Sequence, residues 1–74
     1  MIPAQSDPRW GHFLNNIGNL KVTELATRMV LNRIKLKLSF DNSDSVRKQS
    51  IVEVHAFLTK NENVLQNDIK AIFG

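Results

Sequence analysis

The sequence predicts a small all-α domain, and three observations lead to this fold class. The chain has 74 residues, of which 42% are hydrophobic and 23% are charged, and it contains no Cys. These totals are typical of one globular domain, and they exclude disulfides and thiolate metal sites. Apolar residues recur mostly at intervals of three and four, as one face of a helix requires. Polar, turn-forming stretches divide the periodic part of the chain into four helices.

The domain organisation follows from where this periodicity begins. We expect a flexible arm over residues 1 to 6 and a single helical domain over residues 7 to 74. The arm has no basic region followed by an apolar core, so it does not resemble a signal peptide. No apolar run approaches the roughly 18 residues that a membrane span needs. The sequence therefore predicts a cytoplasmic protein that makes no contact with a membrane.

The first helix is expected over about residues 8 to 17. Asp7 can accept hydrogen bonds from the free N–H groups at a helix start, and Pro8 suits the first helical position. Gly18 is placed to end the helix in a left-handed conformation. One apolar stripe occupies positions i, i+3, i+4 and i+7 of this segment, namely Trp10, Phe13, Leu14 and Ile17.

A long second helix is expected over about residues 22 to 39, with Thr23 as its N-cap. Its main apolar face consists of Val22, Leu25, Ala26, Met29, Leu36 and Phe40. Further apolar residues widen this face sideways, namely Val30, Leu31, Ile34 and Leu38. A helix that is apolar over so much of its circumference needs cover on several sides.

A β-hairpin is the alternative for part of this region. Residues 34 to 40 alternate apolar and polar side chains, and residues 50 to 57 do so in part. A lone hairpin is marginal without further strands or a helix packed on it, and the loop between the two segments contains no Gly. We therefore favour the all-α four-helix domain and keep an α+β fold as the alternative.

The third helix is expected over about residues 45 to 59, after the break DNSDS at residues 41 to 45. Small polar residues of this kind bond their own backbone, and Asp44 or Ser45 can cap the helix. Its main apolar face consists of Val46, Ile51, Val54, Phe57 and Leu58.

The fourth helix is expected over about residues 64 to 73, after the turn KNEN at residues 60 to 63. Asn63 with Gln66 three residues later resembles a capping box. The buried residues of this helix would be Leu65, Ile69, Ile72 and Phe73.

No motif in the sequence indicates catalysis. The two histidines, His12 and His55, are too few for a metal site. A calcium loop needs a Gly and a distal Glu that do not follow Asp41 and Asp44. The chain also lacks a phosphate-cradling Gly loop and a nucleophile at a recognised spacing from a base. We therefore expect a non-enzymatic protein without catalytic residues, metal or cofactor.

The wide apolar surface of the second helix is the basis for the predicted function. A chain this short buries only about 60% of the surface that its unfolded form exposes, and two short outer helices leave the second helix incompletely covered. We expect a small protein-interaction or regulatory module that acts through an apolar helical surface, as a homo-oligomer or with another protein. The predicted interface residues are Trp10, Phe13, Leu25, Met29, Leu36 and Phe40. A second interpretation places Trp10 and Phe13 over the protein's own core.

A basic cluster in the middle of the chain leaves nucleic-acid binding as the alternative function. Residues 28 to 48 hold six cations and two acids, whereas the whole chain has a net charge of +3. The candidate phosphate contacts are Arg28, Arg33, Lys35, Lys37, Arg47 and Lys48. Against this alternative, the last helix would be the recognition helix, and its one cation, Lys70, lies near Asp68.

Overall fold

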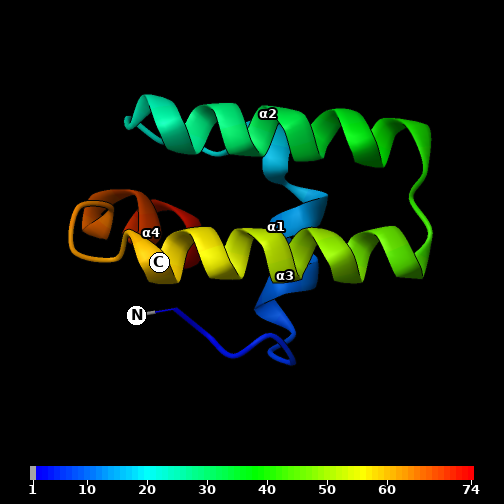
Figure 1. The fold of residues 1–74 in the computed structure, drawn as a ribbon, viewed down its shortest axis with the longest axis horizontal. Coiled ribbons are helices and arrows are strands. Elements are labelled where there is room, and N and C mark those ends of the chain that lie inside the picture. Colours follow the sequence, from blue (N-terminus) through cyan, green and yellow to red (C-terminus); the bar gives the residue numbers. More distant parts are fainter. Residues whose placement is uncertain (1) are drawn as a thin grey trace.

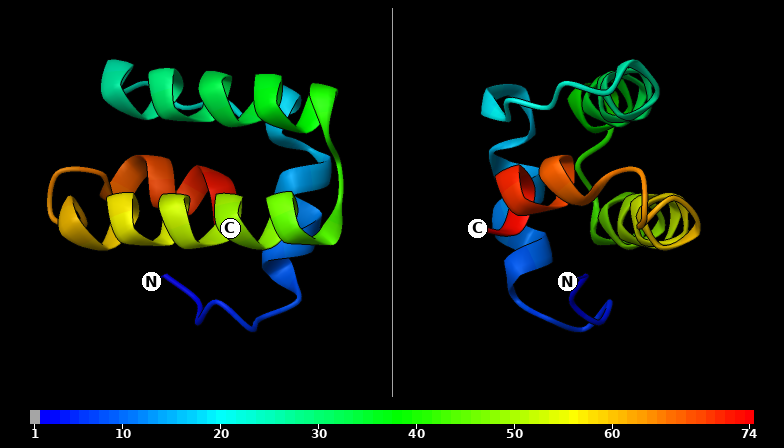
Figure 2. Two further views of the ribbon diagram at one scale, coloured as in Figure 1. Left: turned by 45° about the vertical axis from the view of Figure 1, so that its right-hand side comes forward. Right: turned by 90° about the vertical axis from the view of Figure 1, so that its left-hand side faces the viewer.

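The helices of this protein pack in two layers, as a computed structural model describes for residues 2 to 74. The elements are α1 (Arg9–Asn15), the 3₁₀ turn η1 (Ile17–Asn19), α2 (Leu25–Phe40), α3 (Asp44–Lys60) and α4 (Gln66–Phe73). Helices α2 and α3 run antiparallel side by side, and α1 and α4 lie against them in a second layer (Figures 1 and 2). The predicted all-α four-helix fold is confirmed over the described residues.

The α+β alternative is wrong. Residues 34 to 40 belong to α2 and residues 50 to 57 belong to α3, so neither segment is a strand. Both segments are parts of longer helices, each of which buries one face in the core. Because the buried residues follow the helical repeat, the helix is favoured over a strand.

The connection between α2 and α3 is three residues long and is held by its own side chains. The Asp41 carboxylate accepts a hydrogen bond from the Ser43 backbone N–H at 3.0 Å. The Ser43 hydroxyl oxygen accepts one from the Val46 N–H at 3.3 Å, so Ser43 is the N-cap of α3. The predicted caps, Asp44 and Ser45, are therefore wrong by one or two residues. Asp44 instead lies in the first turn, where a negative charge favours the helix.

Helix α1 begins at Arg9 with Pro8 as its N-cap, one residue later than predicted, and its end also differs from the prediction. Asp7 accepts a hydrogen bond from the Arg9 N–H at 2.9 Å, which satisfies one free donor of the first turn. After Asn15 the chain tightens into η1 without reversing, and Gly18 has no positive φ. The predicted left-handed end at Gly18 is therefore wrong; among the described residues, only Gly74 has a positive φ, at 73°.

The segment that precedes α1 is joined to the core. Pro3 is buried, and its carbonyl oxygen accepts a hydrogen bond from Trp10 Nε1 at 3.2 Å. Ile2 also packs against the core, whereas residues 4 to 6 are exposed. Met1 lies outside the described residues. Flexibility of the arm over residues 1 to 6 stays a prediction.

The start of α2 is fixed by α4. Asp68 is only 3% exposed, and its carboxylate accepts hydrogen bonds from Thr23 N at 2.9 Å, Thr23 Oγ1 at 3.3 Å and Glu24 N at 3.2 Å. The N-cap of α2 is Glu24, one residue after the predicted Thr23. Helix α4 begins at Gln66 after the N-cap Leu65, without a side-chain cap, so the predicted capping box is wrong.

The core lies between the two layers. Its buried apolar side chains come from all four α-helices and include Trp10, Phe13, Ile34, Val54, Leu58 and Ile69. The Trp10 ring meets the edges of two other aromatic rings, with its centroid 5.5 Å from that of Phe13 and 4.8 Å from that of Phe73. Edge-to-face pairs of this kind add to the stability that burial gives. The aromatic stripe of α1 therefore fastens the N-terminal helix to α4.

Candidate functional site

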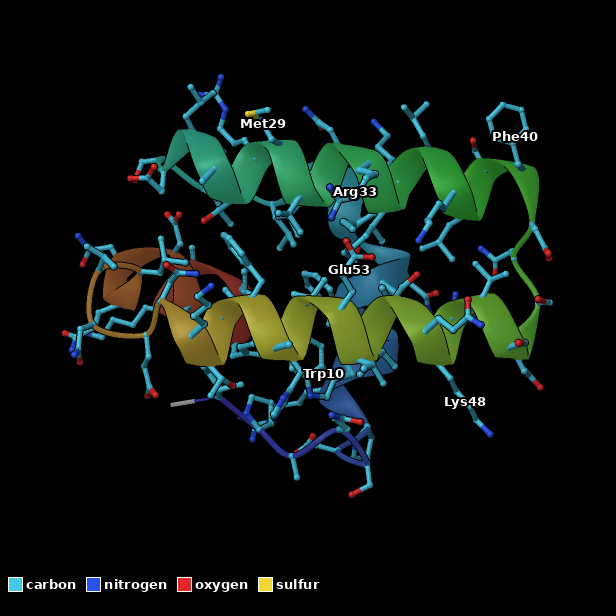
Figure 3. All side chains as sticks on the ribbon, viewed as in Figure 1. Trp10, Met29, Arg33, Phe40, Lys48 and Glu53 are labelled. Atoms are coloured by element: carbon cyan, nitrogen blue, oxygen red, sulfur yellow. The ribbon has the colours of Figure 1, made fainter. Side chains whose placement is uncertain are left out.

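Helix α2 carries an apolar stripe on its solvent side, which we call the outer stripe. Its members are Leu25, Met29, Leu36 and Phe40, with exposed fractions of 60%, 63%, 62% and 88%. At 3.6 residues per turn, these four positions fall within an arc of about 60°. Met29 and Phe40 point away from α3, along the outer edge of the molecule (Figure 3). Four large apolar side chains thus form one ridge that no other part of residues 2 to 74 covers.

The opposite side of α2 faces the core. Its buried residues are Thr27, Leu31, Ile34 and Leu38. The centre of this inner face lies about 180° from the outer stripe at the same helical repeat. The sequence analysis made the outer stripe part of the main apolar face and placed the core-facing residues beside it. The structure assigns the two sides to different surroundings, because α3 and η1 pack on the inner side of α2 and the outer side faces solvent.

Cations flank the outer stripe on both sides. Arg28 and Lys35 lie on one flank, and Arg33 and Lys37 lie on the other, as the helical repeat places them. No Asp or Glu occurs within α2 itself. Within residues 2 to 74, Arg28 and Lys35 make no ion pair. The flank that they form therefore places two cations beside the exposed apolar stripe, one turn after the exposed acid Glu24, which is the N-cap of α2.

The other flank is partly neutralised by α3. Arg33 forms an ion pair with Glu53, and Lys37 Nζ lies 3.5 Å from the second Glu53 carboxylate oxygen. Burial alone would raise the pKa of Glu53, but the Arg33 hydrogen bond and the charges of Arg33 and Lys37 outweigh it. The pKa of Glu53 therefore lies below its ordinary value. Figure 3 shows Arg33 and Glu53 facing each other between the two helices.

The sequence analysis missed Glu53, although a signal for it exists. In an antiparallel helical hairpin, residues at similar distances from the loop lie opposite each other. Arg33 and Glu53 stand at comparable distances before and after the loop at residues 41 to 43. Opposite charges at such positions predict an ion pair across the hairpin.

Trp10 and Phe13 do not belong to the surface. Their exposed fractions are 0% and 2%, and both rings pack against Phe73. Their assignment to an interface was wrong, because α4 covers the aromatic stripe of α1. The alternative interpretation, in which these rings close the protein's own core, is the one that the structure shows.

The six predicted phosphate contacts do not form one free cluster. Arg47 is half-buried, and its guanidinium donates hydrogen bonds to Asn15 Oδ1 at 3.0 Å, Asn42 Oδ1 at 3.1 Å and the Gly11 carbonyl oxygen at 3.4 Å. Arg47 therefore joins α1 to α3. Lys48 points away from α2 on the far side of α3 (Figure 3). Only the four cations of α2 share a surface with the outer stripe.

The described part of the chain contains no group of three or more His, Cys, Asp or Glu side chains that could hold a metal ion. His55 packs beside the Trp10 ring, with centroids 6.0 Å apart, and His12 is exposed at the side of α1.

None of the helices over residues 2 to 74 has the length and apolar character to span a membrane. No protein-family description matches the chain, and neither a curated protein nor a solved structure is significantly similar to it.

Proposed function

We propose that this protein is a non-enzymatic protein-interaction module whose binding surface is the outer stripe of α2. The observation that carries the proposal is the exposure of 60% to 88% at each of its four apolar side chains. Small soluble domains rarely leave large apolar side chains exposed in one contiguous row unless the row binds something. The stripe contributes nothing to the core, so folding alone does not account for it.

The size of the stripe suits a reversible complex. Complete burial of a Leu, Met or Phe side chain is worth about 1.5 to 3 kcal/mol. Burying what remains exposed on these four gives roughly 4 to 8 kcal/mol. Association itself costs about 4 kcal/mol or more, so the flanking cations must supply part of the affinity. The complex that this surface supports is one that forms and dissociates readily.

Self-association and nucleic-acid binding are the competing uses of this surface. Self-association, expected from the sequence, would pair two outer stripes and stays a prediction. Arg47 is not free to bind a phosphate, because its guanidinium is hydrogen-bonded to α1. The charges of Arg33 and Lys37 are partly neutralised by Glu53. No arrangement of the remaining cations favours it over a protein partner.

Site-specific photo-cross-linking in the host cell tests the proposal. A photoreactive phenylalanine analogue replaces Leu36 in one variant and Val52 in another. Val52 is the matched control, because it is also apolar and 49% exposed but lies on α3. We expect protein adducts at position 36, few at position 52, and loss of the first set when Met29→Asp is added. Equal adducts at both positions, or none at position 36, would contradict the proposed surface.

A further inference from the structure

We infer that the partner of the outer stripe is an amphipathic helix of another protein, with acidic side chains on the flank of its apolar face that meets Arg28 and Lys35. This inference rests on the proposed function and names the chemistry of the partner. It is carried by three features of α2, namely the spacing of the stripe, the signs of the flanking charges and the polar residue at its edge.

The spacing of the stripe matches the seam of a two-stranded coiled coil. In a heptad labelled a to g, Met29 and Leu36 occupy a positions, and Leu25 and Asn32 occupy d positions. The next d position is Ser39, and Phe40 follows it at e, at the end of α2. With 16 residues, α2 is about 24 Å long, so it presents a straight ridge that a second helix can follow. A helix packs along such a ridge at an angle of about 20°.

The flanking charges select a partner of opposite sign. Arg28 and Lys35 occupy the g positions of the seam, and Arg33 occupies the central e position. These are the positions that form ion pairs between coiled-coil helices and so choose the partner. All three are cations, but Arg33 is paired with Glu53, so Arg28 and Lys35 carry most of this selection. Helix α2 itself contains no acid for a neighbour. A helix with Glu or Asp at its own e and g positions would neutralise them.

The same charges disfavour a second copy of this chain. In an antiparallel pair each flank meets its own counterpart, so Arg28 and Lys35 would face Arg28 and Lys35 of the other copy. In a parallel pair the g flank meets the e flank, so the same two cations would face Arg33. Both arrangements place like charges along the seam, which is how coiled coils reject unwanted pairings.

The middle of the seam distinguishes a protein from a lipid surface. Asn32 is exposed between Met29 and Leu36 along the helix, at the edge of the outer stripe and at a d position of the seam. Burying its amide without a hydrogen-bond partner is unfavourable. Acyl chains offer no such partner, whereas a facing helix can place a polar side chain opposite the amide.

The test uses the full chain and two designed peptides of about 21 residues that share one apolar seam with a central Asn. One peptide has Glu at every e and g position, and the other has Lys there. Fluorescence anisotropy of the labelled peptides measures the affinity. We expect the acidic peptide to bind at least about tenfold more tightly, and its affinity to weaken with added salt because exposed charges are screened.

Charge-reversed variants make the result specific to the flank. The double substitution Arg28→Glu and Lys35→Glu should lower the affinity for the acidic peptide about tenfold or more and raise the affinity for the basic peptide. Lys48→Glu with Lys70→Glu changes the net charge equally, at exposed positions outside α2, and should change the affinity little. Leu36→Asp should abolish binding of both peptides, and circular dichroism would check that each variant is folded.

The possible outcomes separate this inference from the proposed function. Equal binding of both peptides would overturn the acidic partner and leave the apolar surface standing. Sedimentation as a dimer that Leu36→Asp dissociates would identify a second copy as the occupant. The third outcome is that neither peptide binds, while phosphatidylserine vesicles bind through the outer stripe or a mixed DNA duplex binds in a salt-sensitive way. This outcome would contradict both the inferred helical partner and the proposal of a protein partner. No binding to any of these probes would overturn the proposed function itself.

Discussion

Replacing Asp68 with Ala should be among the most destabilising single changes outside the apolar core. The Asp68 carboxylate is 3% exposed and accepts three hydrogen bonds, two from Thr23 and one from Glu24. It is the link that holds the start of α2 against α4. Asp68→Ala removes all three bonds and leaves two backbone N–H groups to find water.

The magnitude follows from the charge of the acceptor. A hydrogen bond to a charged group contributes about 1.5 to 3 kcal/mol. Thr23 and Glu24 are exposed residues, so water recovers part of this loss. We therefore expect a destabilisation of about 2 to 4 kcal/mol. For a chain of this length that is roughly a third of the total stability, and it lowers Tm by roughly 10 to 25 °C.

Thermal and urea unfolding, followed by far-ultraviolet circular dichroism, measures this effect. Asp44→Ala is the matched control, because Asp44 is also an acid in the first turn of a helix but is exposed. The control should lose only the interaction with the helix dipole, about 0.3 to 1 kcal/mol. Asp68→Asn keeps one acceptor oxygen and should fall between the two. If Asp68→Ala and Asp44→Ala differed by less than about 0.5 kcal/mol, the hydrogen bonds of Asp68 would not anchor α2.

Three further predictions concern other buried or paired groups. Thr27→Val should stabilise the fold by about 1 kcal/mol, because the Thr27 hydroxyl is buried with no hydrogen-bond partner in residues 2 to 74; destabilisation on urea unfolding would refute this. Acidification from pH 6 to 3 should lower the free energy of unfolding of the wild type more than that of Glu53→Gln. The reason is that the pKa of Glu53 in the folded state lies below its ordinary value of 4.5, so the stability that its charge gives is lost as pH falls. The difference should stay under about 1 kcal/mol, and identical pH profiles would count against the ion pair with Arg33. Arg47→Ala should cost about 1 to 2 kcal/mol, and Arg47→Lys should not restore it, because an ammonium group lacks the fork that reaches Asn15 and Asn42 together.

Local patterns predicted the helices well, and tertiary contacts decided most of the errors. The periodic apolar residues placed all four helices within three residues of their observed bounds. The capping signals were less reliable, since Gly18 and the Asn63–Gln66 pair do not act as expected. The contact between Thr23 and Asp68 joins residues 45 positions apart, and the sequence around either residue does not predict it.

The candidate site could be predicted only in part, for a physical reason. The sequence showed that α2 is apolar over much of its circumference, and this feature led to Leu25, Met29, Leu36 and Phe40. Periodicity could not decide which side faces the core, because both sides carry large apolar residues. That choice depends on the direction from which the other helices approach. The same limit applies to Trp10 and Phe13, whose spacing indicates a stripe but not what covers it.

The two opposite faces of α2 separate the requirements of folding from those of recognition. Residues such as Ile34, which is fully buried, determine whether the chain folds, and residues such as Leu36 project into water. Substitutions along the outer stripe that suit a helix should therefore change the stability of the scaffold little, whereas Pro or Gly would break or weaken α2. A library that varies only Leu25, Met29, Leu36 and Phe40, without Pro or Gly, should yield mostly folded members, and so give a small cysteine-free framework for selecting new binders.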